Sequence, residues 1–114
     1  MTDLKNAVLT VLLGIQANGP RDSKNGICGN IADYLMSKSI SFTDGELDAV
    51  LDPLFDSWPE KSHSAAYPVG KWSKTPSSLF WFHYDNQRSM WDVDTRYGKA
   101  RWNLLYHMIQ ELNK

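Results

Sequence analysis

Cationic and aromatic side chains alternate through the second half of this sequence, and together they have the chemistry to bind a nucleotide. An aromatic ring stacks on a nucleobase, and an arginine fork holds a phosphate through two hydrogen bonds. We predict a ligand-binding site formed by eight such residues: Lys71, Trp72, Arg88, Trp91, Arg96, Tyr97, Lys99 and Arg101. The alternative is that these side chains lie along the rim of the core with their stems buried.

Two of these cations fall at the start of the last predicted helix. Arg96 and Lys99 lie in its first turn, beside Gly98. Positive charge at that end opposes the helix dipole, and a bound phosphate would relieve the conflict. This placement favours a small anionic ligand.

The one cysteine, Cys28, lies where a second helix is expected to begin. A helix N-terminus favours the reactive thiolate, so a nucleophilic pair of Cys28 with a histidine is one hypothesis. The candidate partners are His63, His83 and His107. The alternative is a buried, inert thiol, because cysteine is among the most commonly buried residues and no cysteine-enzyme signature surrounds it.

The glycine-rich segment from Arg21 to Gly29 is a second candidate anion site. Backbone amides at a helix start bind anions, and Arg21 and Lys24 would add charge. The segment lacks the glycine spacing and the Lys-Ser/Thr ending of a P-loop, and no strand precedes it as in a dinucleotide fingerprint. An ordinary turn between helices is the alternative.

Metal-binding patterns are weak in this chain. The histidines have no metal-ligand spacing, and Asp92 and Asp94 precede a helix, where aspartates usually act as N-caps. We therefore expect no metal and no cofactor.

Length and charge narrow the class of protein. A chain of 114 residues with 42% hydrophobic and 22% charged residues fits a single compact, soluble domain over residues 1–114. Residues 1–57 carry four basic and eight acidic residues, a net charge of -4, whereas residues 58–114 carry eight and five, a net charge of +3. The near-neutral total makes nucleic acid an unlikely partner, no apolar run is long enough to span a membrane, and one cysteine excludes an internal disulfide.

Hydrophobic periodicity predicts the elements that position these residues. Apolar stripes indicate helices over residues 4–15, from about Cys28, after the Thr43–Glu46 capping box, and after Asp92, Asp94 or Thr95. Gly19 and Pro20 end the first helix, and Pro53 kinks or divides the third. Residues 59–78 read as a long loop, and residues 79–84 and 88–92 as the two strands of a hairpin. The expected fold class is α+β, with about four helices packed with one short antiparallel β-hairpin.

Several short motifs together resemble a group of small uncharacterised accessory proteins of tailed bacteriophages. They are Asn25-Gly-Ile-Cys28 after Gly19-Pro20, Leu54-Phe55 with Trp58-Pro59, Ser64 with Tyr67-Pro68-Val69, Trp91-Asp92, and the run Tyr97 to Leu105. The last helix of that group is usually more acidic than Arg101-Trp102 here. The resemblance implies an accessory protein that acts in the cytoplasm of an infected host cell, and it carries over no catalytic residue.

The sequence therefore predicts a phage accessory binding protein, not an enzyme, that sequesters a small anionic ligand such as a nucleotide immune signal. One alternative is a protein–protein inhibitor of a host enzyme, anchored by exposed aromatic side chains. Another is a small Cys28-dependent enzyme. Because small domains often build a nucleotide pocket between subunits, a homo-oligomer is also expected.

Overall fold

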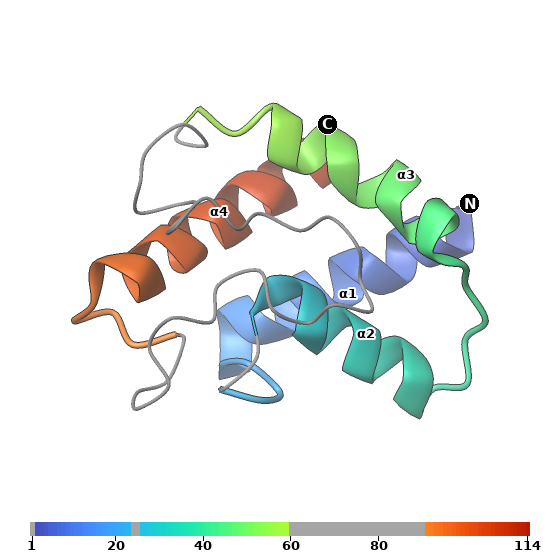
Figure 1. Cartoon of the computed structure of the whole chain (residues 1–114), viewed down its shortest axis with the longest axis horizontal. Coiled ribbons are helices and arrows are strands. Elements are labelled where there is room, and N and C mark those ends of the chain that lie inside the picture. Colours follow the sequence, from blue (N-terminus) through green and yellow to red (C-terminus); the bar gives the residue numbers. More distant parts are fainter. Residues whose placement is uncertain (1, 24–25, 60–90) are drawn as a thin grey trace.

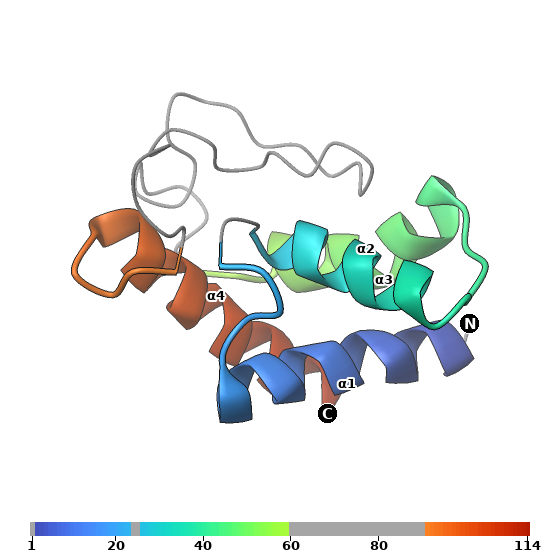
Figure 2. The ribbon, with the colours of Figure 1, turned by 90° about the horizontal axis from the view of Figure 1, so that it is seen from below.

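Four α-helices form the part of the chain that the structure, a computed structural model, describes: residues 2–23, 26–59 and 91–114. The helices are α1 (Thr2–Asn18), α2 (Ile27–Ser37), α3 (Asp44–Asp56) and α4 (Arg96–Leu112). The α1 helix contacts each of the other three, and α3 also contacts α4. Figures 1 and 2 show α2 lying over α1, with α4 crossing behind α3. The central position of α1 means that both hollows described below have α1 as a wall.

The four helices share one apolar core. The predicted stripe of α1 is buried from Leu4 to Ile15, and the stripe of α4 is buried from Leu104 to Leu112. Phe55 of α3 is completely buried in the same core. Each large apolar side chain buried in this way contributes about 1.5–3 kcal/mol. None of the described helices has the length and apolar character needed to cross a membrane.

The end of α1 follows the predicted signal. Gly19 has a φ of 90°, and its N–H donates to the Ile15 carbonyl at 2.8 Å, which ends α1. Only glycine adopts such a φ at low cost. The sequence predicted that Pro53 kinks or divides this helix, and α3 continues through Pro53 as one helix, so it is not divided there.

The predicted capping box at the start of α3 is confirmed. The Glu46 N–H donates to Thr43 Oγ1 at 3.1 Å, and the Thr43 N–H donates to Glu46 Oε1 at 2.8 Å. These two hydrogen bonds satisfy backbone donors that have no partner inside the helix.

We expect this cap to weaken in acid. The backbone N–H of Thr43, which donates to the carboxylate, holds the pKa of Glu46 below its ordinary value of 4.5. A lowered folded-state pKa adds stability above the ordinary pKa, and this stability is lost as the pH falls through the folded-state value. Glu46→Gln keeps an acceptor at every pH. The free energy of unfolding, measured with urea at pH 7 and at pH 3, should therefore fall less in acid for the variant than for the wild type. An equal fall for both proteins would contradict the role of the Glu46 carboxylate in the cap.

The α+β prediction was wrong, because the described residues are all-helical and contain no strand. The second predicted strand ends at Trp91 and Asp92, which form a turn before α4. The Asp92 carbonyl accepts the Thr95 N–H at 3.0 Å, and the Trp91 carbonyl accepts the Trp102 indole N–H at 2.9 Å. These acceptors are used to start and brace α4, not to form a strand ladder. The other hairpin residues lie outside the described part of the chain.

Candidate functional site

The predicted second-half site is only partly covered by the described residues. Lys71, Trp72 and Arg88 lie outside them, as do the side chains of Arg96 and Tyr97 at the start of α4. The side chains that the structure does place are those of three residues: Trp91, Lys99 and Arg101.

These three side chains do not share one surface. Trp91 is 5% exposed and Arg101 is 1% exposed, whereas Lys99 is exposed. Positions two apart on a helix point to different sides, which separates Lys99 from Arg101. Trp91 meets the ring of Trp102 edge-on, with centroids 5.0 Å apart. Trp91 belongs to the apolar core cluster, and Arg101 is buried as well.

The Cys28 thiol is also in the core, with 1% of the residue exposed. Buried cysteines of this kind are inert, because a nucleophile must reach its substrate. His107 is half-buried, and its Nε2 lies 2.8 Å from Ser57 Oγ. Among the described residues no group of three metal-ligating side chains comes together. The placement of Cys28 thus gives no support to a Cys28-dependent enzyme.

A hollow between α1 and α2 gathers residues that sequence reasoning had not combined. Its volume is about 280 Å³. Its lining consists of Thr10, Val11, Gly14, Ile15, Asn18, Gly19, Arg21 and Tyr34. Nothing lies within 4 Å of where a Cβ of Gly14 would be, so the missing side chain leaves this wall of α1 open. A glycine inside a helix costs about 1 kcal/mol relative to alanine, and here it keeps the hollow accessible.

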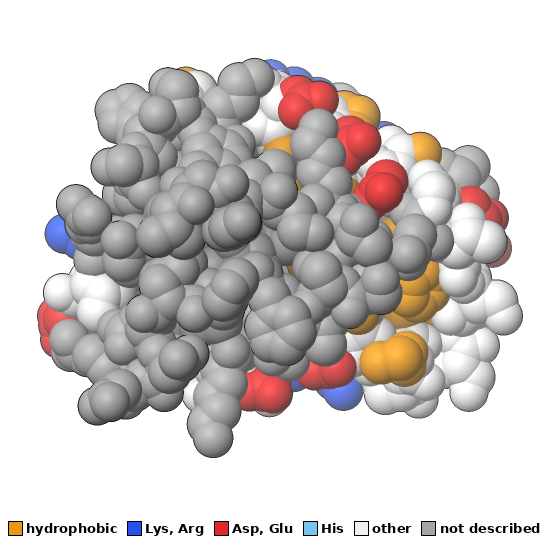
Figure 3. Space-filling model, in the orientation of Figure 1, with side chains coloured by type: hydrophobic (Ala, Val, Ile, Leu, Met, Phe, Trp, Pro, Cys, Tyr) orange, Lys and Arg blue, Asp and Glu red, His pale blue; other side chains and the backbone are white. Residues whose placement is uncertain are grey.

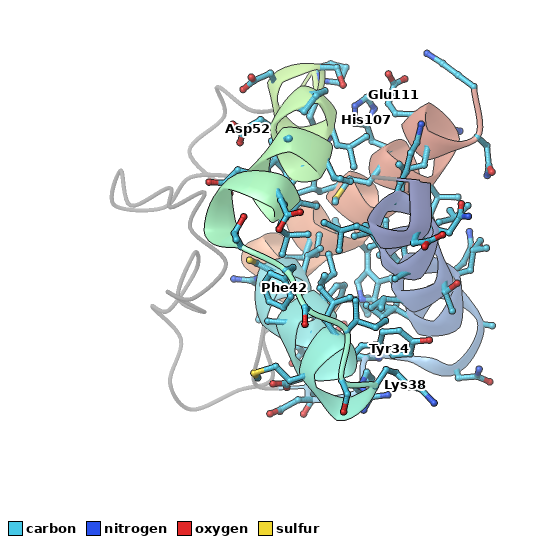
Figure 4. All side chains as sticks on the ribbon, turned by 90° about the vertical axis from the view of Figure 1, so that its right-hand side faces the viewer. Tyr34, Lys38, Phe42, Asp52, His107 and Glu111 are labelled. Atoms are coloured by element: carbon cyan, nitrogen blue, oxygen red, sulfur yellow. The ribbon has the colours of Figure 1, made fainter. Side chains whose placement is uncertain are left out.

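Two cations surround the Tyr34 ring at the edge of this hollow. The Arg21 guanidinium carbon is 5.5 Å from the ring centroid, and Lys38 Nζ is 5.8 Å from it. Figure 4 shows Tyr34 and Lys38 together at one end of the molecule. Ser37 helps to hold Arg21, because Arg21 Nη2 donates to Ser37 Oγ at 3.4 Å while that hydroxyl donates to the Tyr34 carbonyl at 2.8 Å.

A buried amide fixes the loop that carries Arg21. Asn30 is fully buried, and its side chain accepts the Asp22 N–H at 2.9 Å and donates to the Asp22 carbonyl at 3.1 Å. It also donates to the Gly26 carbonyl at 2.9 Å. A buried polar side chain that meets its hydrogen-bonding needs on one loop rigidifies that loop. Asn30 therefore sets the position of Arg21 relative to α2.

The sequence held partial signals for this site. Arg21 belongs to the loop that was predicted to bind an anion. The backbone amides of that predicted site belong to the first turn of α2, and this turn is buried. Tyr34 and Lys38 are four residues apart, which makes them neighbours on a helix. The spacing of Gly14 from Arg21 and Tyr34 in the sequence does not indicate that these three residues lie together.

Two cationic side chains, Arg21 and Lys38, lie at this site. Within residues 2–23, 26–59 and 91–114, neither Arg21 nor Lys38 forms an ion pair with a carboxylate. Figure 3 shows acidic side chains over α3 and others along the lower edge of the molecule, near α2. A site with two available cations and one aromatic ring suits an anion that carries a flat ring.

The chemistry of this site has to be inferred from its geometry. No family model, no curated protein and no solved structure matches the chain.

Proposed function

We propose that this protein binds a small anion with a flat ring, of the nucleoside monophosphate class, in the hollow between α1 and α2. The observation that carries the proposal is the pair of cations around Tyr34 beside a hollow that Gly14 keeps open. Arg21 would hold the phosphate through its fork, and Lys38 would add a point charge.

The lining of the hollow suits the ring of such a ligand. Val11 and Ile15 offer apolar contacts, and the side chains of Thr10 and Asn18 can hydrogen-bond to the ring edge. A volume of about 280 Å³ is near the lower end of ligand pockets, which run from about 300 to 1,000 Å³. One copy therefore suits a mononucleotide, and a larger dinucleotide would need the hollows of two copies in a homo-oligomer.

The role that fits this binding is sequestration. The resemblance to phage accessory proteins suggests that the ligand is a nucleotide immune signal in the cytoplasm of the host cell. A binding protein acts there by lowering the free concentration of the signal.

Calorimetric titration tests the proposal. The ligands are AMP, GMP, adenosine and inorganic phosphate. We expect a monophosphate to bind at least tenfold more tightly than adenosine or phosphate alone, because only the nucleotide uses both the cations and the hollow. The amide signals of Gly14, Asn18 and Tyr34 should shift in a parallel NMR titration. No monophosphate binding tighter than about 100 μM would reject the proposal.

A further inference from the structure

A second hollow lies between α1, α3 and α4, away from the cations described above. Its volume is about 330 Å³. The residues that line it are Lys5, Ala49, Val50, Pro53, Leu54, Glu111 and Leu112. Figure 4 shows Glu111 at the opposite end of the molecule from Tyr34 and Lys38. The two hollows therefore present separate sites.

Apolar side chains form the inner part of this second hollow. Val50, Leu54 and Leu112 belong to the core cluster and contribute apolar surface. Pro53 has no N–H, so the helical hydrogen bond to the Ala49 carbonyl cannot form. Both of these residues line the hollow.

Opposite charges occupy the rim. Lys5 is exposed, and within the described residues it forms no ion pair with Glu111. A hydrogen bond from Lys114 holds the pKa of Glu111 below its ordinary value of 4.5, so the carboxylate is charged at neutral pH. Lys114 Nζ lies 2.6 Å from Glu111 Oε2, and Lys114 is 72% exposed. A surface pair of this kind is worth at most about 1 kcal/mol, so a ligand can share or displace it.

We propose that this hollow binds a free α-amino acid with a branched apolar side chain. The ligand carboxylate binds Lys5, and its ammonium group donates to Glu111. The side chain packs on Val50, Leu54 and Leu112. A zwitterion matches one cation and one anion on the same rim, whereas a simple anion or a simple amine would satisfy only one of them. This site does not depend on the nucleotide proposal.

An NMR titration with L-leucine tests the site in the full chain. We expect the amide signals of Ala49, Val50 and Leu112 to shift, with a Kd of about 1 mM. N-acetyl-leucine lacks the ammonium group and leucine methyl ester lacks the carboxylate, so each should bind at least tenfold more weakly. The absence of shifts at these amides up to about 10 mM leucine would overturn the proposal, as would equal binding of all three compounds.

Variants separate the two charged contacts from general charge effects. Lys5→Gln and Glu111→Gln should each weaken leucine binding about tenfold, which corresponds to one charge-assisted contact. Glu111→Gln also removes the ion pair with Lys114, so Lys114→Gln is the matched control. That control should leave leucine binding unchanged or make it tighter. If Lys114→Gln weakens leucine binding as much as Glu111→Gln does, the assignment of Glu111 as the contact for the ligand ammonium group is overturned.

Discussion

Gly98→Ala is expected to destabilise the protein by about 2 kcal/mol or more. A Cβ at Gly98 would fall on the backbone of Asp92 and would lie 2.6 Å from its carbonyl carbon. The turn cannot move away freely, because the Asp92 carbonyl also accepts the Thr95 hydroxyl at 2.8 Å. Thr95 Oγ1 in turn accepts the Gly98 N–H at 2.9 Å and caps α4. The substitution therefore combines backbone strain with the loss of a helix cap.

Urea denaturation followed by tryptophan fluorescence measures this effect, and Gly45→Ala is the matched control. Gly45 also lies in the first turn of a helix, but nothing is within 4 Å of its Cβ position. The free energy of unfolding of the control variant should equal that of the wild type or exceed it by up to about 1 kcal/mol, since alanine is a better helix former than glycine. If the two variants unfold at the same urea concentration, the close approach of Asp92 to α4 is not a feature of the protein in solution.

Arg21→Gln and Lys38→Gln are each expected to weaken nucleoside monophosphate binding about tenfold, and the double variant about a hundredfold. Each substitution removes a charge beside Tyr34 and keeps a polar side chain of similar length. A hydrogen bond to a charged group contributes about 1.5–3 kcal/mol, and about 1.4 kcal/mol is a factor of ten in affinity. Calorimetric titration with AMP or GMP, whichever binds the wild type more tightly, measures the effect.

Two further variants show whether the loss of nucleotide affinity comes from the site between α1 and α2. Lys99→Gln removes an exposed cation from α4 and should leave the affinity within a factor of two or so of the wild type, because salt screens distant charges. Gly14→Leu keeps every charge but fills the hollow, and it should weaken monophosphate binding while leaving the helix intact. Equal weakening by Lys99→Gln and Arg21→Gln would mean that binding follows the net charge and not the site.

Much of the helical structure could be read from residues close together in sequence. The Thr43–Glu46 capping box starts α3, and Gly19 ends α1, as predicted. Both signals depend on hydrogen bonds that reach no further than four residues, so a short window of sequence contains the whole interaction. The apolar stripes of α1 and α4 were readable for the same reason, since burial follows the helical period.

The predicted hairpin shows where local patterns fail. Residues 88–92 were predicted as the second strand of a hairpin, but a strand also needs a partner for its backbone. Around Trp91 and Asp92 the backbone acceptors bind Trp102 and Thr95 instead. Whether these acceptors bind α4 or a neighbouring strand depends on how α4 packs. The local pattern of residues does not contain that information.

By itself, the sequence determined the end of α1, the start of α3, which helix faces are apolar, and that cations and aromatic residues are present. Only the tertiary structure decided which of these cationic and aromatic side chains lie together. Trp91 and Arg101 are drawn into the core, whereas Arg21 reaches Tyr34 because Asn30 anchors its loop against α2. The physical reason is that helix formation is encoded in contacts a few residues apart, but burial and the grouping of side chains depend on which helix surfaces pack together.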